Sequence, residues 1–222
     1  MPRRCGLRIA TKAAATTAII GPMLEQRIQQ HFIDSADLKY QAAQVLSLPI
    51  AAAVQAILAC VTSGGKVLAC GSGVSAAQAR QFAAWCVAGF ERERPELAAV
   101  FLSEDSSLQE GPFGSVWDPE QGLARQVRAL GQAGDVLIAL SVTGIDPFIL
   151  AAAAAAHERD MTVVALSGRT GGDLPALLRE TDVLISVPHD RAARVREVHT
   201  LALHCLCDGV DAQLLGEQEI PL

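Results

Sequence analysis

The spacing of hydrophobic residues is helical in the first part of the chain. Between residues 23 and 63, apolar side chains recur at helix intervals, as at Ile28, Phe32 and Ile33, and residues 50–60 form an alanine-rich amphipathic run. This periodicity predicts two helices. They would precede any sheet.

The pattern then changes to short apolar runs, each followed by a helical stretch. Such alternation predicts a parallel sheet covered by helices on both faces. The expected fold is therefore α/β: a three-layer sandwich around a five-stranded parallel sheet, with N-terminal helices ahead of it. The expected strands cover residues 66–70, 98–102, 135–141, 162–167 and 182–187.

The length and composition favour one domain. A chain of 222 residues, 50% hydrophobic, can bury a single sheet core, and it contains no evident linker. The expected domain covers residues 23–215, with a short C-terminal tail at 216–222. Residues 1–22 lack the apolar core and cleavage site of a targeting peptide, so we interpret them as a disordered extension or as sequence ahead of a true start at Met23.

Charge and cysteine content exclude several classes of protein. Four of the 18 basic residues lie in residues 1–22, leaving 14 against 24 acidic residues in the remainder. Such an acidic body disfavours direct binding of nucleic acid. The six cysteines lack the spacing of a disulfide framework, and the uninterrupted apolar runs are shorter than the roughly 20 residues of a membrane helix. We expect a soluble cytoplasmic protein that is not bound to a membrane.

Two loops rich in glycine and hydroxyl residues are the candidate binding sites. One runs from Cys70 to Ser75 and the other from Ser141 to Pro147, and each joins an expected strand to a helix. Ligands of open α/β sheets bind at such strand ends, and helix N-termini attract anions. Either loop alone also fits an ordinary turn. The candidate phosphate- or sugar-binding residues are Gly71, Ser72, Gly73, Ser75, Ser141, Thr143 and Gly144.

Together, the two loops resemble the SIS (sugar isomerase) domain of phosphoheptose isomerases. That family has a strand followed by Cys-Gly-Asn-Gly-x-Ser and later a strand ending in Ser-x-Ser-Gly-Asn-Ser. The chain has Cys-Gly-Ser-Gly-Val-Ser at 70–75 and Ser-Val-Thr-Gly-Ile-Asp at 141–146. The similarity extends over residues 23–212. Other matching segments are 93–95, 131–137, 161–168, 187–189 and 194–204.

The resemblance implies a catalytic zinc site whose positions are mostly changed in this chain. In the family, a His and a Glu on the helix after the first loop and a Gln and a His on the C-terminal helix hold zinc and serve the enediol chemistry. The corresponding residues are Gln81, Trp85, Arg196 and His204. Amide, indole and guanidinium groups do not form such a site. We therefore expect no metal or cofactor, with zinc present only if the protein is an isomerase.

Two of these residues allow alternative interpretations. His204 is the one retained candidate for acid–base catalysis, but a lone histidine in an apolar helix is more often a packed core or interface residue. Trp85 either fills the former cavity or stacks on a ligand. We favour the filled cavity.

The second loop also departs from the family pattern. Its final serine is replaced by Asp146, which Pro147 follows, and Ala193 stands where the family has a sugar-binding Asp. An Asp followed by Pro is a strong helix-start signal. The Asp146 carboxylate is therefore expected to cap the free N–H groups of the helix and to repel a phosphate.

Four short stretches, at residues 75–77, 90–95, 126–131 and 205–208, resemble the homotetrameric DnaA initiator-associating proteins more closely. Because most of the family's zinc-binding residues are also replaced, this likeness favours a non-catalytic tetrameric scaffold that binds the replication initiator and regulates chromosome replication. Leu214 and Leu215 are the candidate contact residues. The alternatives are a phosphoheptose isomerase, which makes D-glycero-D-manno-heptose 7-phosphate for lipopolysaccharide, or a sugar-phosphate sensor. A homotetramer is expected in each case.

Overall fold

The computed structural model describes residues 7–103 and 118–216. The chain divides into two compact units, Met1–Tyr40 and Gln41–Leu222. The described part of the first unit is helical. The second unit contains the sheet and all the candidate site residues.

Helix α1 (Leu7–Thr62) is one helix of 56 residues and runs through both units. The expectation of two helices that begin at Met23 is therefore wrong. Pro49 is the residue that most opposes a helix between the two apolar runs, and it costs one main-chain hydrogen bond that the neighbouring alanines help to offset. By length and composition, Met23–Thr62 could also span a membrane. A helix buried in the core of a folded protein meets the same criteria.

The five predicted parallel strands are confirmed. β1 and β3 are buried along their whole length, as expected for strands covered on both faces. The order is β2-β1-β3-β4-β5, with Leu68 opposite Leu137 and Leu137 opposite Val163. The strands are β1 (Val67–Gly71), β2 (Ala99–Phe101), β3 (Val136–Leu140), β4 (Thr162–Ser167) and β5 (Val183–Ser186).

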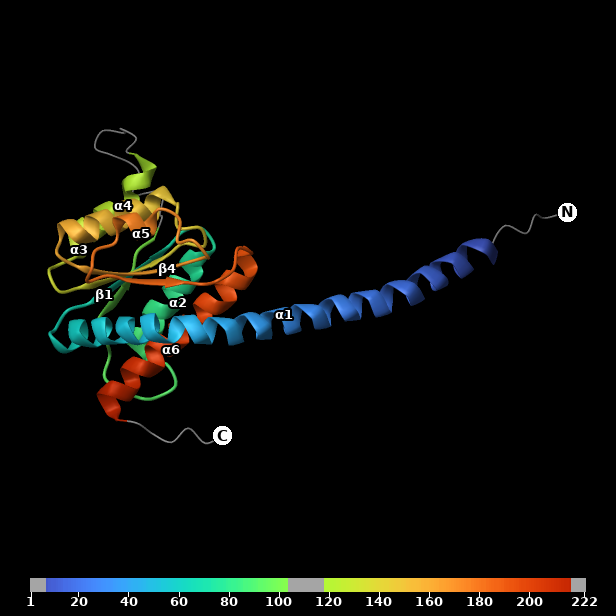
Figure 1. Cartoon of the computed structure of the whole chain (residues 1–222), viewed down its shortest axis with the longest axis horizontal. Helices are drawn as coiled ribbons and strands as arrows, with labels where there is room; N and C mark the ends of the chain where they lie inside the picture. Colours follow the sequence, from blue (N-terminus) through green and yellow to red (C-terminus); the bar gives the residue numbers. More distant parts are fainter. Residues whose placement is uncertain (1–6, 104–117, 217–222) are drawn as a thin grey trace. The chain divides into compact units, whose positions relative to one another are not determined.

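Helices cover both faces of the sheet, which confirms the three-layer architecture (Figure 1). On one face lie α3 (Gly122–Leu130), α4 (Pro147–Glu158) and the short α5 (Leu174–Leu177), after the single turn η3 (Pro119–Gln121). On the other lie α2 (Ser75–Ala88), α6 (Ala192–Leu215) and residues 41–62 of α1.

Small residues allow close packing in both helical layers. The buried alanines of α4, such as Ala152 and Ala153, pack with Leu68 and Leu137 in one core cluster. On the other face, a Cβ at Gly209 of α6 would lie 2.8 Å from a methyl carbon of Val54. A larger residue at position 209 would force α1 and α6 apart.

The strand order determines where a ligand can bind. β1 and β3 are neighbours, and the helices that follow them, α2 and α4, cover opposite faces. The two chain directions therefore diverge between β1 and β3, which is where open α/β sheets bind ligands. Both glycine-rich loops lie at this point.

Candidate functional site

The first loop joins β1 to α2 in a tight turn at the carboxyl edge of the sheet. The Ser72 amide donates to the Leu140 carbonyl at 2.9 Å, which holds the loop against the end of β3. A Cβ at Gly71 would lie 2.5 Å from the Ser75 carbonyl oxygen, and Gly73 has φ +52°. These glycines are required by the backbone.

The Ser75 hydroxyl has unsatisfied hydrogen-bonding capacity. Ser75 begins α2 and is fully buried, and its Oγ has no hydrogen-bond partner among the residues that the structure describes. Unpaired buried polar atoms are costly and uncommon in folded proteins. The helix start therefore offers one donor that the described residues do not use.

The second loop also packs closely against its neighbours. Gly144 has φ +73°, and a Cβ there would lie 1.9 Å from the Gly171 carbonyl oxygen. The Asp173 amide donates to the Gly144 carbonyl at 3.0 Å. The loops after β3 and β4 are thereby joined at the same edge.

Asp146 occupies the centre of the predicted phosphate-binding residues. Its carboxylate accepts hydrogen bonds from the Ser72 hydroxyl at 2.7 Å, from the Thr143 hydroxyl at 3.1 Å and from the Ser141 hydroxyl. The Ser141 oxygen in turn accepts from the Gly144 amide at 2.7 Å. Three of the four hydroxyl groups expected to face a ligand phosphate therefore donate to this carboxylate, and the Ser75 hydroxyl does not.

This arrangement corrects the expectation that the Asp146 side chain caps α4. Asp146 is the N-cap residue and Pro147 begins the helix, but the carboxylate makes no capping hydrogen bond. The Ile149 and Leu150 amides donate instead to the Asp146 main-chain carbonyl, each at 3.0 Å. The carboxylate is therefore free to accept from the three hydroxyls.

Helices α2 and α6 lie side by side and carry the four positions that the family resemblance singles out. The Gln78 side-chain amide donates to the Arg196 carbonyl at 2.8 Å and to the Thr200 hydroxyl at 2.7 Å. Gln81, one turn further along α2, is exposed, and Arg196 is half-buried with its Nε unpartnered among the described residues. Gln78 and Thr200 were missed in the sequence because neither lies in a recognisable motif.

An aromatic cluster occupies the end of this helix pair. The Trp85 ring centroid lies 4.9 Å from that of His204 and 5.2 Å from that of Phe90, both in edge-to-face geometry. The Phe90 and His204 centroids are 5.2 Å apart. The structure thus brings Trp85 and His204 together, and the indole packs where the family resemblance places a metal-binding Glu.

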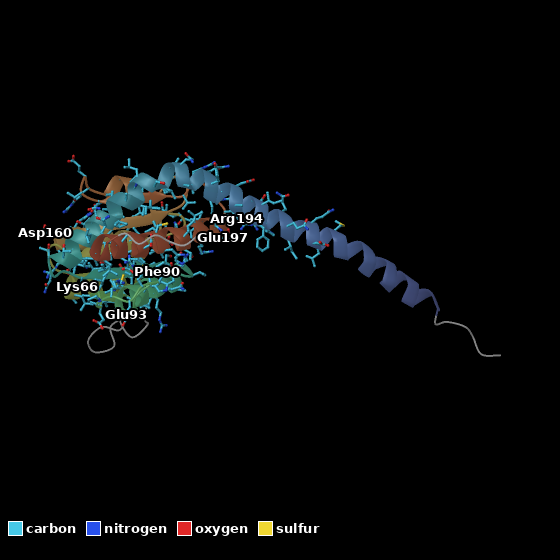
Figure 2. The ribbon with its side chains drawn as sticks, turned by 90° about the horizontal axis from the view of Figure 1, so that it is seen from below. Lys66, Phe90, Glu93, Asp160, Arg194 and Glu197 are labelled. Carbon is cyan, nitrogen blue, oxygen red and sulfur yellow. The ribbon has the colours of Figure 1, made fainter. Side chains whose placement is uncertain are left out.

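Arg94 holds this cluster in place from the loop after α2. Its guanidinium donates to the Trp85 and Cys86 carbonyls at 3.0 and 2.8 Å, which caps the last turn of α2. It also forms an ion pair with Asp211 of α6 at 2.5 Å, and both side chains are buried. Glu93 and Phe90 lie on this same loop (Figure 2). Asp211 lies 117 positions from Arg94, so no local pattern could reveal the pair.

His199 is a second buried group on α6. A Ser167 carbonyl lies 3.1 Å from its Nε2, which must therefore carry the proton, while Nδ1 has no partner among the described residues. Burial, and then the nearby Arg196 charge, lower the pKa of His199 to about 4. The ring is neutral at physiological pH and is structural in this position.

The residues at the family zinc positions do not fit a zinc ion. Gln81 offers an exposed amide, Trp85 has no lone pair for a metal, and Arg196 is cationic. Within residues 7–103 and 118–216, no three or more His, Cys, Asp and Glu side chains are grouped as a metal site requires. His204 alone keeps a ligand type.

Comparisons of sequence and of structure with known proteins relate this chain to the same family. The SIS domain family model matches residues 31–168. The chain is 61% identical to the phosphoheptose isomerase of Methylibium petroleiphilum over 198 residues, 89% of this chain and 98% of that protein. It is 50% identical to that of an Azoarcus species over 88% of this chain and 99% of that protein. The phosphoheptose isomerase structure from Neisseria gonorrhoeae superposes with a TM-score of 0.77 at 43% identity, covering 85% of this chain and 99% of that one.

These relationships overturn the expectation of a non-catalytic scaffold that binds the replication initiator. The relatives just described carry the name phosphoheptose isomerase and match over nearly their whole length. The likeness to DnaA initiator-associating proteins covers only four short stretches, which this longer similarity outweighs. Leu214 and Leu215 are exposed, as expected, but the proposed initiator contact has no support.

Proposed function

Because the chain belongs to the SIS domain family and, within it, to the phosphoheptose isomerases, we propose that it is an aldose–ketose isomerase that acts on sedoheptulose 7-phosphate. The observation that carries this proposal is the 61% identity to a named phosphoheptose isomerase over 98% of that relative's length. A shared fold alone does not indicate a shared function, but sequence identity at this level over a whole domain supports one. The carboxyl edge of the sheet is then the substrate site.

The first loop is suited to hold the phosphorylated sugar. It presents the start of α2, where the positive end of the helix dipole favours an anion. Ser75 adds a hydroxyl without a partner among the described residues. Gly71 and Gly73 allow the backbone to turn closely at this point.

His204 is the proposed acid–base residue. Isomerisation through an enediol moves a proton between adjacent carbons, which a correctly positioned histidine can do. The ring is half-buried, and its nitrogens make no hydrogen bond within the described part of the chain. Trp85 and Phe90 pack against the ring and fix its orientation. In this proposal the reaction needs no zinc, since the chain lacks the other ligands.

A second candidate function is a sugar-phosphate sensor that binds without turnover. The observation in its favour is the aromatic packing of Trp85 against His204 at 4.9 Å, which replaces a catalytic carboxylate with an apolar ring. Such a protein would keep the strand-end loops and lose the chemistry.

Turnover distinguishes the two functions. Purified protein is incubated with sedoheptulose 7-phosphate, with zinc or with a chelator, and aldose formation is followed by NMR beside an active isomerase. We expect turnover that zinc does not change, that His204→Ala lowers by about 100-fold, and that Cys205→Ala, at an exposed neighbour on α6, leaves intact. A rise in melting temperature without turnover would establish the sensor instead. The absence of both turnover and a rise in melting temperature would contradict both functions.

We also propose a cytoplasmic homotetramer. Large apolar side chains on α1, such as Phe32, Tyr40 and Leu48, are 75%, 78% and 83% exposed in the single chain. Several such side chains on one helix favour burial against other copies. Sedimentation equilibrium should give four chains per particle, and a monomer would contradict this assembly.

A further inference from the structure

Asp146 differs from the other aspartates that lie inside hydrogen-bond networks. Asp135, Asp182 and Asp211 each face a basic side chain at 2.6 Å or less: Lys66, His157 and Arg94 respectively. Asp146 has no such partner among the described residues, and its side chain accepts only from hydroxyl groups. No basic side chain in the described part of the chain therefore pairs with this carboxylate.

The donors around Asp146 are those that a bound anion would require. They come from two loops, with Ser72 following β1 and Ser141 and Thr143 following β3, and all converge on one carboxylate. Hydroxyl groups near a helix start suit a phosphate equally well. A phosphate and the carboxylate cannot both hold these donors, and their like charges would repel at contact distance.

We propose that Asp146 is an internal anion that occupies the phosphate-binding position of the site and determines its ligand preference. The carboxylate competes with the phosphate group of a sugar phosphate and leaves the binding of uncharged sugar hydroxyls unaffected. A phosphate monoester binds only when the Asp146 side chain leaves the three hydroxyls. This inference rests on the proposed function, because that function places a phosphorylated sugar at this edge.

The test compares three variants of the full chain. Asp146→Asn removes the charge with little change in shape, and Asp146→Ser introduces the hydroxyl of the family pattern. Asp160→Asn is the matched control. Asp160 is exposed, and its φ of 54° suits Asn. Within the unit that contains the sheet, it lies with Lys66 on the side away from Arg194 (Figure 2). Arg194 lies in α6 just after β5 and so marks the carboxyl edge, where the site lies. Asp160→Asn therefore removes one negative charge far from the site.

Binding is measured by titration calorimetry at constant ionic strength with three probes: sedoheptulose 7-phosphate, inorganic phosphate and unphosphorylated sedoheptulose. We expect both Asp146 variants to bind the two phosphates at least about tenfold more tightly than the wild type, because a like charge is removed at contact distance. Affinity for sedoheptulose should stay within about twofold, and Asp160→Asn should resemble the wild type with every probe.

Unchanged or weaker phosphate binding in both variants would overturn the inference, and so would an equal gain for the unphosphorylated sugar. If both variants fail to fold, Asp146 is a structural tie and the inference is also wrong. The outcome is separate from turnover. Tighter phosphate binding in the variants of a protein without isomerase activity would support the inference while contradicting the proposed function.

Discussion

The amino edge of the sheet, where the strands begin, and the carboxyl edge, where they end, differ in the hydrogen bonds that their aspartates accept. At the amino edge, Asp135 accepts from the Lys66 and Gln132 amides at 2.9 and 2.8 Å and pairs with the Lys66 ammonium at 2.6 Å. Asp182 likewise accepts from the Val163 and Arg179 amides, each at 2.7 Å. At the carboxyl edge, Asp146 accepts from side-chain hydroxyls alone among residues 7–103 and 118–216.

The difference separates a structural carboxylate from a functional one. Main-chain amides cannot move away from Asp135 and Asp182 without unfolding the turns that carry them. Hydroxyl groups rotate and can accept other partners at little cost. The amino edge therefore holds the strands in register, and the carboxyl edge keeps donors that a ligand can take.

The largest effect is expected at Asp182, whose side chain is fully buried. Asp182→Ala leaves two amides and the His157 ring without an acceptor, so the free energy of unfolding should fall by about 4 kcal/mol. Urea unfolding at neutral pH measures this loss. A loss below about 1 kcal/mol would show that the amino edge does not have the structural role described.

Acid should weaken the carboxyl edge through His199. Its pKa is about 4 in the folded protein, below the ordinary value of 6.5, so the unfolded chain binds the extra proton between these values. The stabilisation from the neutral ring is complete above pH 6.5 and is lost as the pH falls to about 4, a total of about 3 kcal/mol.

The change His199→Gln removes this titration and keeps a donor for the Ser167 carbonyl. Unfolding followed in urea at pH 7, 5.5 and 4 should show a shallower acid dependence in the variant than in the wild type. Equal slopes in the two proteins would contradict the assignment.

The smallest effect is expected for the hydroxyls around Asp146. Ser72→Ala removes one neutral donor at a partly buried position and should lower the free energy of unfolding by about 1 kcal/mol or less. Thermal unfolding measures this change, with Thr143→Val as the matched loss of a second hydroxyl at an exposed position. A loss as large as that of Asp182→Ala would remove the distinction between the edges.

Periodicity and turn residues predicted most of the fold. Apolar runs between glycine-rich turns located all five strands, and Gly71 and Gly144 were found because tight strand-to-helix turns require them. The continuity of α1 was missed because its periodicity divides into two separate apolar runs, with Pro49 just before the second. In this helix the proline is tolerated.

Long-range pairing explains what the sequence left out of the site. The Asp146 carboxylate meets Ser72 across 74 positions and Arg94 meets Asp211 across 117, distances at which no spacing rule applies. Asp146 was expected to cap its own helix because local donors are the nearest along the chain. The prediction of a non-catalytic scaffold was wrong because it followed the replaced zinc-binding residues and not the similarity of the remaining chain.

Exchange of substrate hydrogen with solvent tests the proposed isomerase most directly. Sedoheptulose 7-phosphate is incubated in deuterium oxide with the protein and a chelator, and the C1 protons are followed by NMR. An enediol formed by the proposed base predicts deuterium at C1 in the wild type and about 100-fold slower exchange with His204→Ala. Exchange no faster than in buffer, beside an active isomerase that exchanges readily, would contradict catalysis by this chain.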